Sequence, residues 1–226
     1  MSRADRMGRR AFFGAAATGG AAFMVRSVSP EEPPDRQAGI SAAEDLMREH
    51  GVMDRLLLVY EEAHGAMSVE LDVSLALVVR ATRLVQDFIE AYHEQLEEEF
   101  IFPRMQEGDG YERLVRILRK QHEASRAVTS RILTRAEGAG RPAPVGDELD
   151  AYVRMYRPHM AREDTVLFPA MYGVIPPPEL DELGEQFEER EHELFGDDGF
   201  AAVVDQVAEM EQELGIHDLA QFTPYA

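Results

Sequence analysis

The chain has 226 residues, 45% of them hydrophobic, which is enough for one sizeable core and indicates one domain with extensions. A formal net charge of −20 at pH 7 disfavours binding to nucleic acid or anionic lipid, because the long-range field of the chain repels both. The absence of cysteine excludes disulfides, thiolate-bound metals and a cysteine nucleophile. Any metal chemistry must therefore use nitrogen and oxygen ligands.

The first segment of the chain has the pattern of an export signal. Arg9 and Arg10 precede a mildly apolar run over residues 12–25, which is rich in alanine and glycine. This pattern resembles a twin-arginine signal, so residues 1–29 are predicted to be a signal or short anchor that directs the chain to the periplasm or the extracellular space. The run is shorter than the roughly 20 residues of a membrane-spanning helix, and no second apolar segment follows. Pro30 disfavours cleavage, so release and retention both stay open.

After a polar, proline-rich linker at residues 30–40, four segments carry apolar residues spaced three and four apart, the period of an α-helix. The first helix is predicted to begin near Ser41, which forms a capping-box pattern with Glu44. The others are predicted at about residues 72–104, 111–137 and 146–172, and Pro158 is expected to kink or restart the last one. Short connections imply antiparallel neighbours, so residues 41–172 are predicted to form an up-down-up-down four-helix bundle.

The end of the chain is also predicted to be helical. After three prolines at residues 176–178, helical patterning resumes to about Phe195 and again from Asp198 to Leu214. These two helices are expected to cover the bundle as an extension over residues 173–226. No segment alternates polar and apolar residues for long enough to predict a strand, so the fold class is all-α.

One motif occurs twice in the chain. Residues 93–103 and 159–169 both have the pattern His-x-x-x-Glu-acid-x-x-x-Phe-Pro. Helical residues four apart differ by about 40° in direction and about 6 Å along the axis, so the histidine and glutamate of each motif point into one pocket. His50 and His122 lie on the inward stripes of the two preceding helices. Each of the four helices therefore offers an inward histidine.

The two glutamates of these motifs indicate a metal. A carboxylate on an apolar stripe is unfavourable unless it is paired or coordinated, and cations would relieve Glu97 and Glu163. Four imidazoles and two carboxylates suit iron, with manganese or zinc as lesser possibilities, and a carboxylate can bridge two ions. The two motifs therefore predict a buried metal site, in which each motif can hold one or two ions.

The spacing and the Phe-Pro tails resemble the hemerythrin-like, HHE cation-binding domain family over about residues 41–172. The resemblance implies a non-haem di-iron centre that binds dioxygen or senses oxygen, nitric oxide or iron. Arg126 stands where oxygen-carrying hemerythrins have a further histidine, which favours redox reactivity or sensing over reversible oxygen carriage. The metal ligands that the resemblance implies are His50, His93, Glu97, His122, His159 and Glu163.

A ferritin-like di-iron oxidase or peroxide-consuming enzyme is the alternative, because the helices of such proteins carry Glu-x-x-His. That spacing occurs at Glu61, Glu90 and Glu189, but only Glu90 precedes an inward metal candidate. A metal-binding or sensing protein is therefore favoured over an enzyme, with no catalytic residue or organic cofactor site predicted. The expected partner is a small molecule such as dioxygen, nitric oxide or peroxide. A metal-free helical protein would leave both inward glutamates uncompensated.

Several residues near the motifs are expected to be structural. Glu98, Glu99 and Asp164 follow a ligand candidate by one or two positions, which turns them away from their own pocket and predicts surface positions. Tyr156 is expected either to fill the core or to touch the site. His64 lies four turns along the first stripe and is expected to be structural. The remaining histidines, His192 and His217, are expected on an acidic solvated face and in a helix-ending turn.

Overall fold

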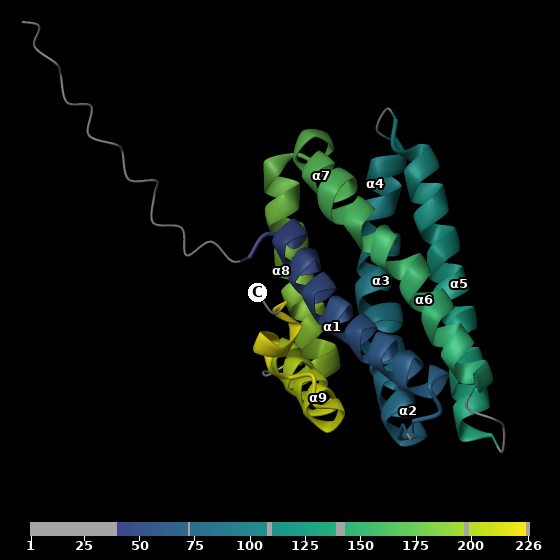
Figure 1. Cartoon of the computed structure of the whole chain (residues 1–226). Coiled ribbons are helices and arrows are strands. Elements are labelled where there is room, and N and C mark those ends of the chain that lie inside the picture. Colours follow the sequence, from purple (N-terminus) through teal and green to yellow (C-terminus); the bar gives the residue numbers. More distant parts are fainter. Residues whose placement is uncertain (1–39, 72, 108–109, 139–142, 197–198, 225–226) are drawn as a thin grey trace, which may run out of the picture. The chain divides into compact units, whose positions relative to one another are not determined.

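The computed structural model describes residues 40–71, 73–107, 110–138, 143–196 and 199–224 (Figure 1). Within these ranges every regular element is a helix and no strand occurs, which confirms the all-α prediction. None of the helices in these ranges is long and apolar enough to cross a membrane. The twin-arginine pattern and the linker as far as Gly39 lie outside the described residues.

The first helix, α1 (Ala42–Ser68), begins where the capping box was predicted. The Ser41 hydroxyl accepts a hydrogen bond from the Glu44 backbone N–H, and the Glu44 carboxylate accepts one from the Ser41 backbone N–H at 3.1 Å. These two bonds satisfy donors that the first turn of a helix leaves open. The apolar stripe of α1, including Leu46, Met53 and Leu57, is buried.

The predicted second helix exists but changes its winding at the motif. It starts at Leu75, later than predicted, and runs to Glu107. Two stretches are wound as π-helix, which has wider turns and is frequent at functional sites. The succession is α2 (Leu75–Leu84), η1 (Val85–His93), α3 (Glu94–Leu96), η2 (Glu97–Ile101) and α4 (Phe102–Glu107).

The second half of the bundle repeats this pattern. Helix α5 (Glu112–Glu137) is followed by α6 (Ala143–Arg162), a π-helical turn η3 (Glu163–Leu167) and α7 (Phe168–Val174). Pro158 lies inside α6, which continues to Arg162, so of the two predicted outcomes, a kink or a restart before His159, the restart is wrong. Proline keeps a helical φ and removes one backbone donor, a loss that a packed helix can tolerate.

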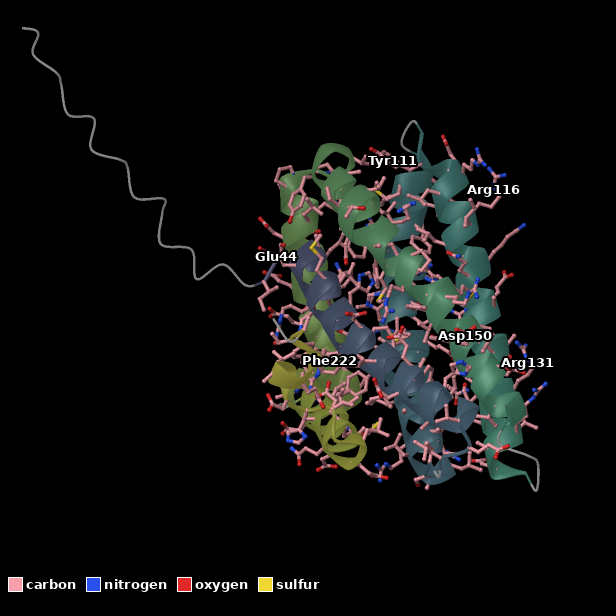
Figure 2. The ribbon with its side chains drawn as sticks, viewed as in Figure 1. Glu44, Tyr111, Arg116, Arg131, Asp150 and Phe222 are labelled. Carbon is pink, nitrogen blue, oxygen red and sulfur yellow. The ribbon has the colours of Figure 1, made fainter. Side chains whose placement is uncertain are left out.

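The helices pack around one apolar core. Helix α1 contacts α6 and η1, and α5 contacts α6 and α2. Two further helices, α8 (Pro177–Phe195) and α9 (Gly199–Leu214), pack against α1 and each other, beside α1 and away from α5 (Figure 1). A short 3-10 helix, η4 (Leu219–Phe222), follows. Charged side chains such as Arg116 and Arg131 point outward from α5 and are exposed (Figure 2). Part of the apolar core therefore lies between α1, η1, α5 and α6.

Candidate metal site

Four histidines meet in two pairs between these helices. His50 from α1 and His93 from η1 have their Nε2 atoms 3.1 Å apart. His122 from α5 and His159 from α6 have theirs 3.2 Å apart. All four imidazoles are buried, with at most 4% of their surface exposed.

Two glutamates lie between the histidine pairs. Glu97 Oε2 is 3.8 Å from the Nε2 atom of His93 and 3.4 Å from that of His122. Glu163 Oε2 is 3.5 Å from the Nε2 atom of His50 and 3.1 Å from that of His159. Each carboxylate therefore reaches one histidine of each pair. The structure brings all six predicted ligand candidates together at one buried place.

The outer nitrogen of each histidine meets a hydrogen-bond acceptor. A carboxylate or amide oxygen at Nδ1 requires that nitrogen to carry the proton, so the Nε2 lone pair turns inward. The same arrangement is common around metal-bound histidines, because it orients the ring and strengthens it as a ligand. The pairs are His50 with Asp164 at 2.7 Å, His93 with Glu49 at 2.6 Å, His122 with Glu98 at 2.9 Å and His159 with Gln121 at 3.0 Å.

Glu98 and Asp164, predicted on the surface, are partly exposed, with 20% and 37% of their side-chain surface accessible, but each also contacts a histidine of the site. Each turns away from the pocket of its own motif, but it thereby faces the adjacent helix, where the outer nitrogen of a histidine lies. Glu99 is exposed as predicted. The acidic residue that follows each motif glutamate therefore contacts a histidine of a facing helix, a role that the spacing of the motif did not indicate.

The phenylalanine of each Phe-Pro tail also contacts the site. Phe102 stacks on His122 with ring centroids 5.3 Å apart, and Phe168 stacks on His50 at 5.4 Å. Each motif copy thus supplies a shared glutamate, an outer acceptor and an aromatic platform around one histidine. The two halves of the site are built in the same way.

The electrostatics of the six residues favour a cation. Burial lowers the pKa of His93 and His122 to about 4, and burial together with nearby His50 lowers that of His159 to about 3, so these rings are neutral at pH 7. Neutral imidazoles whose lone pairs face each other near 3 Å repel unless a positive ion lies between them. Ligands bound about 2.1 Å from one ion are separated by about 3.0–3.4 Å, close to the distances found here.

The two motif glutamates are also uncompensated. None of their four carboxylate oxygens has a hydrogen-bond partner among the described residues. Burial raises the pKa of both, and the neighbouring Glu163 and Glu94 raise that of Glu97 further. The ligand atoms fall into two overlapping groups, each within 4.8 Å, which share Glu97. The donor set therefore fits two adjacent cations.

Arg126 takes a different place from that of a ligand. Its Nη2 atom donates to Glu98 Oε1 at 2.7 Å and lies 2.9 Å from Glu94 Oε2. Burial would raise the pKa of Glu98, but the hydrogen bonds from His122 and Arg126 outweigh it and lower this pKa to about 2. Arg126 therefore keeps the outer partner of His122 charged.

Tyr156 touches the site. Its ring centroid lies 4.8 Å from that of His159, and its hydroxyl donates to Glu94 Oε1 at 3.1 Å. Tyr152 stacks on Tyr156 with centroids 5.2 Å apart. Glu94 is fully buried and carries a strongly raised pKa, because burial outweighs the nearby charge of Arg126. A phenol and a carboxyl group thus lie beside the histidines.

Other histidine and glutamate candidates lie elsewhere. His64 is half-buried and belongs to no metal-binding group among the described residues, while His192 and His217 are exposed. Glu90 accepts hydrogen bonds from Ser125 at 3.0 Å and Thr129 at 2.8 Å. The carboxylate of Glu90, which belongs to a Glu-x-x-His pattern, is therefore bound by two hydroxyl groups.

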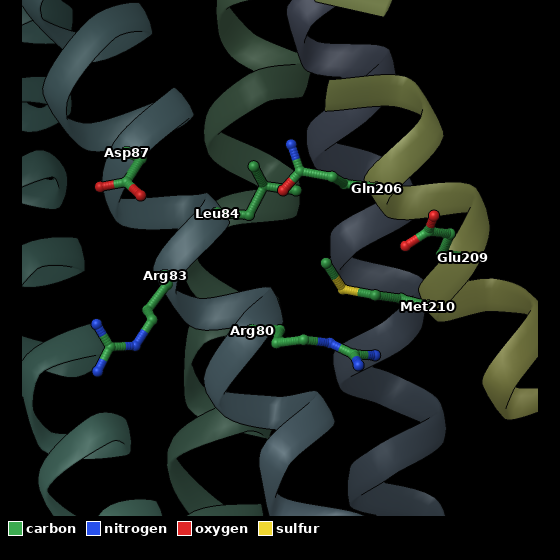
Figure 3. Close-up of a pocket in the computed structure, with 7 residues that line it drawn as sticks. All are labelled: Arg80, Arg83, Leu84, Asp87, Gln206, Glu209 and Met210. Atoms are coloured by element: carbon green, nitrogen blue, oxygen red, sulfur yellow. The ribbon is translucent and has the colours of Figure 1, made fainter. Parts of the chain in front are cut away.

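A groove of about 280 Å³ lies away from this site, between α2, η1 and α9 (Figure 3). Its walls include Arg80, Arg83 and Met210. None of the six ligand candidates lines it. The histidine and glutamate cluster is thus separate from this groove.

Comparison with known proteins covers the part of the chain that carries both motifs. The family model described as "Hemerythrin HHE cation binding domain" matches residues 41–171. Uncharacterized proteins of Mycobacterium tuberculosis and Mycobacterium bovis are each 40% identical to this chain over 223 residues, covering 93% of this chain and 88% of the relative. No solved structure matches. The match spans both His-x-x-x-Glu motifs.

Proposed function

Since this chain belongs to the hemerythrin HHE cation-binding domain family, we propose that it is a non-haem di-iron protein built on an up-down-up-down four-helix bundle. The supporting observation is the convergence of four inward imidazole nitrogens and two unpartnered buried carboxylates. Nitrogen and oxygen donors in this ratio suit iron, with manganese or zinc as lesser possibilities.

The residues divide naturally between two ions. His50 and His93 would hold one ion, His122 and His159 the other, and the two glutamates would be shared. Iron would supply redox chemistry and an affinity for small oxygen species or nitric oxide. The four outer acceptors keep the Nδ1 protons in place and aim the rings, and the surrounding helices exclude water.

We propose that the protein binds or senses dioxygen, nitric oxide or peroxide, or senses iron, rather than carrying oxygen reversibly. The supporting observation is that Arg126 is engaged by Glu94 and Glu98 and does not add a seventh ligand of the kind that a further histidine would supply. The twin-arginine pattern at Arg9 and Arg10 supports export of the chain to the periplasm or extracellular space. In that case the chain would acquire its metal before it crosses the membrane in folded form.

A second candidate is a di-iron oxidase or peroxide-consuming enzyme. One observation favours it: Tyr156 contacts His159 and donates to the buried Glu94. A phenol with an adjacent carboxyl group can hold or move a proton at its hydroxyl oxygen. Burial and the nearby Glu94 raise the pKa of Tyr156, which keeps this proton in place at neutral pH.

Iron content tests the site. The full chain, produced with iron and desalted, is expected to retain about two iron ions. His159→Ala is expected to lose two-metal binding, because one of the two ions would keep only one histidine of its pair. His64→Ala is the control, since His64 lies outside the cluster. Elemental analysis that finds no iron in the wild-type chain, or equal loss in both variants, would contradict the proposal.

Spectroscopy separates the two candidate functions. The reduced protein is mixed with dioxygen, and its absorption spectrum is followed. A stable adduct formed without consumption of dioxygen supports binding or sensing, whereas ready release of unchanged dioxygen would indicate reversible carriage and contradict the argument from Arg126. Prompt oxidation with consumption of dioxygen or peroxide supports the enzyme.

A further inference from the structure

An acidic cluster lies beside the histidine site, where α1 meets α8. Asp45 and Glu49 are one turn apart on α1, and Glu191 comes from α8. Each offers a carboxylate oxygen, and the three atoms lie within 4.8 Å of one another. Asp45 is 4% exposed and Glu49 is fully buried. Acidic groups so close together and so well buried require compensation.

Two oxygens of this cluster lack hydrogen-bond partners among the described residues: Asp45 Oδ2 and Glu49 Oε1. The other oxygen of each residue is engaged. Asp45 Oδ1 lies 3.4 Å from Arg48 Nη1, and Glu49 Oε2 accepts from His93 Nδ1 at 2.6 Å. Arg48 and His93 therefore each engage one oxygen of a carboxyl group and leave Asp45 Oδ2 and Glu49 Oε1 without a hydrogen bond.

Tyr92 lies beside the cluster: its side chain is 1% exposed, and its hydroxyl interacts with the Glu49 carboxyl group. A neutral hydroxyl oxygen beside the carboxylates can serve as a further ligand for a hard cation.

Glu191 is held in position by the start of α9. The Phe200 backbone N–H donates to Glu191 Oε1 at 2.8 Å. Gly199 leaves room for this carboxylate, because a Cβ atom there would lie 2.8 Å from the same oxygen. The start of α9 therefore leaves room for Glu191 and holds its carboxylate.

We propose that Asp45, Glu49 and Glu191 bind a further divalent cation, distinct from the two-metal site. An all-oxygen ligand set selects a hard ion such as Mn²⁺, Mg²⁺ or Fe²⁺. Arg48 neutralises part of the charge from one side, at 43% side-chain exposure, and leaves Asp45 Oδ2 available. Glu49 joins the two sites, because its second oxygen holds His93.

Manganese binding tests this site. In equilibrium dialysis against Mn²⁺, the iron-loaded full chain is expected to bind about one additional ion. Glu191→Gln keeps the side-chain shape and removes the charge, so it is expected to weaken this binding at least about tenfold. Glu185→Gln, an exposed position on the same helix, is the matched control.

The outcomes separate this inference from the two-metal proposal. Equal Mn²⁺ binding by the wild-type chain and Glu191→Gln, with both folded by circular dichroism, overturns the further site and leaves the iron result untouched. Loss of Mn²⁺ binding in Glu191→Gln, while His159→Ala holds as much iron as the wild-type chain, supports the further site and contradicts the two-metal proposal.

Discussion

The partners of individual histidines differ between the two halves of the site. His93 is held by the carboxylate of Glu49, whereas the corresponding acceptor for His159 is the neutral amide of Gln121. A carboxylate at Nδ1 makes the opposite ring nitrogen a stronger donor than an amide does. The two histidine pairs are therefore alike in geometry but differ in their outer partners, because His50 and His93 have two acidic partners whereas His122 and His159 have one acidic and one amide partner.

Arg126→Ala is predicted to destabilise the folded chain. It removes the positive charge beside the fully buried Glu94 and half-buried Glu98, and breaking such a contact should lower the free energy of unfolding by about 1–3 kcal/mol. Urea unfolding measures the loss. Adding Glu94→Gln to the same variant should recover part of it, because the buried carboxyl group that has lost its partner is then replaced by an amide that cannot ionise. Two single variants whose effects simply add would argue against this pairing.

At the scale of elements, π-helical winding coincides with both motifs. The turns η2 and η3 begin at Glu97 and Glu163, the two shared glutamates. A wider turn changes the direction of the residues that follow it, and here these residues include the outer acceptors Glu98 and Asp164. The same elements that carry the ligand candidates therefore also carry the acceptors for the facing helices.

Gly199, the first residue of α9, is predicted to be sensitive to substitution. Gly199→Ala places a Cβ atom 2.8 Å from Glu191 Oε1 and 3.0 Å from Phe195 Cβ. We expect a lower melting temperature and weaker Mn²⁺ binding, with iron content unchanged. Gly65→Ala in α1 is the control, because nothing lies within 4 Å of its added Cβ and alanine favours a helix. Equal melting temperatures for the two variants would contradict the close approach at Gly199.

At the scale of the whole molecule, the buried acids set how stability depends on pH. Burial, together with Glu49 and Glu191, raises the pKa of Asp45 to about 7, and burial raises that of Glu49 to about 8. In the unfolded chain these groups ionise near their ordinary values of 3.8 and 4.5. As pH rises, the unfolded state loses these protons first, so the metal-free fold loses stability until the folded groups also ionise.

The histidines act in the opposite direction at lower pH. Their folded pKa values lie below the ordinary 6.5, so the unfolded chain takes up protons first as pH falls from 6.5 toward 4, and the fold loses stability there. Above about pH 6.5 the histidines are mostly neutral in both the folded and the unfolded chain, so the pH dependence of stability comes from the buried acids. The free energy of unfolding of the metal-free chain should therefore fall from pH 6.5 to 8, and Asp45→Asn should make this decline shallower. Urea unfolding at several pH values would refute the assignment if both chains gave the same slope.

The sequence by itself determined the helices and the six ligand candidates. Apolar stripes of helical period and a motif that lies within a single helix are local patterns. Such patterns can be read from the sequence without knowing how the helices pack. The all-α class and the capping box at Ser41 followed from them and are confirmed. The role of the six residues as metal ligands stays a prediction.

Only the tertiary structure decided what surrounds those residues. The partner of His50 is Asp164, 114 positions away, and the partner of His93 is Glu49, 44 positions away. The pairing of Arg126 with Glu94 and the approach of Glu191 to Asp45 likewise join separate helices. Such contacts depend on how helices are rotated and wound against one another, which the period of a single helix does not specify. For this reason Glu98 and Asp164, expected on the surface, became part of the site.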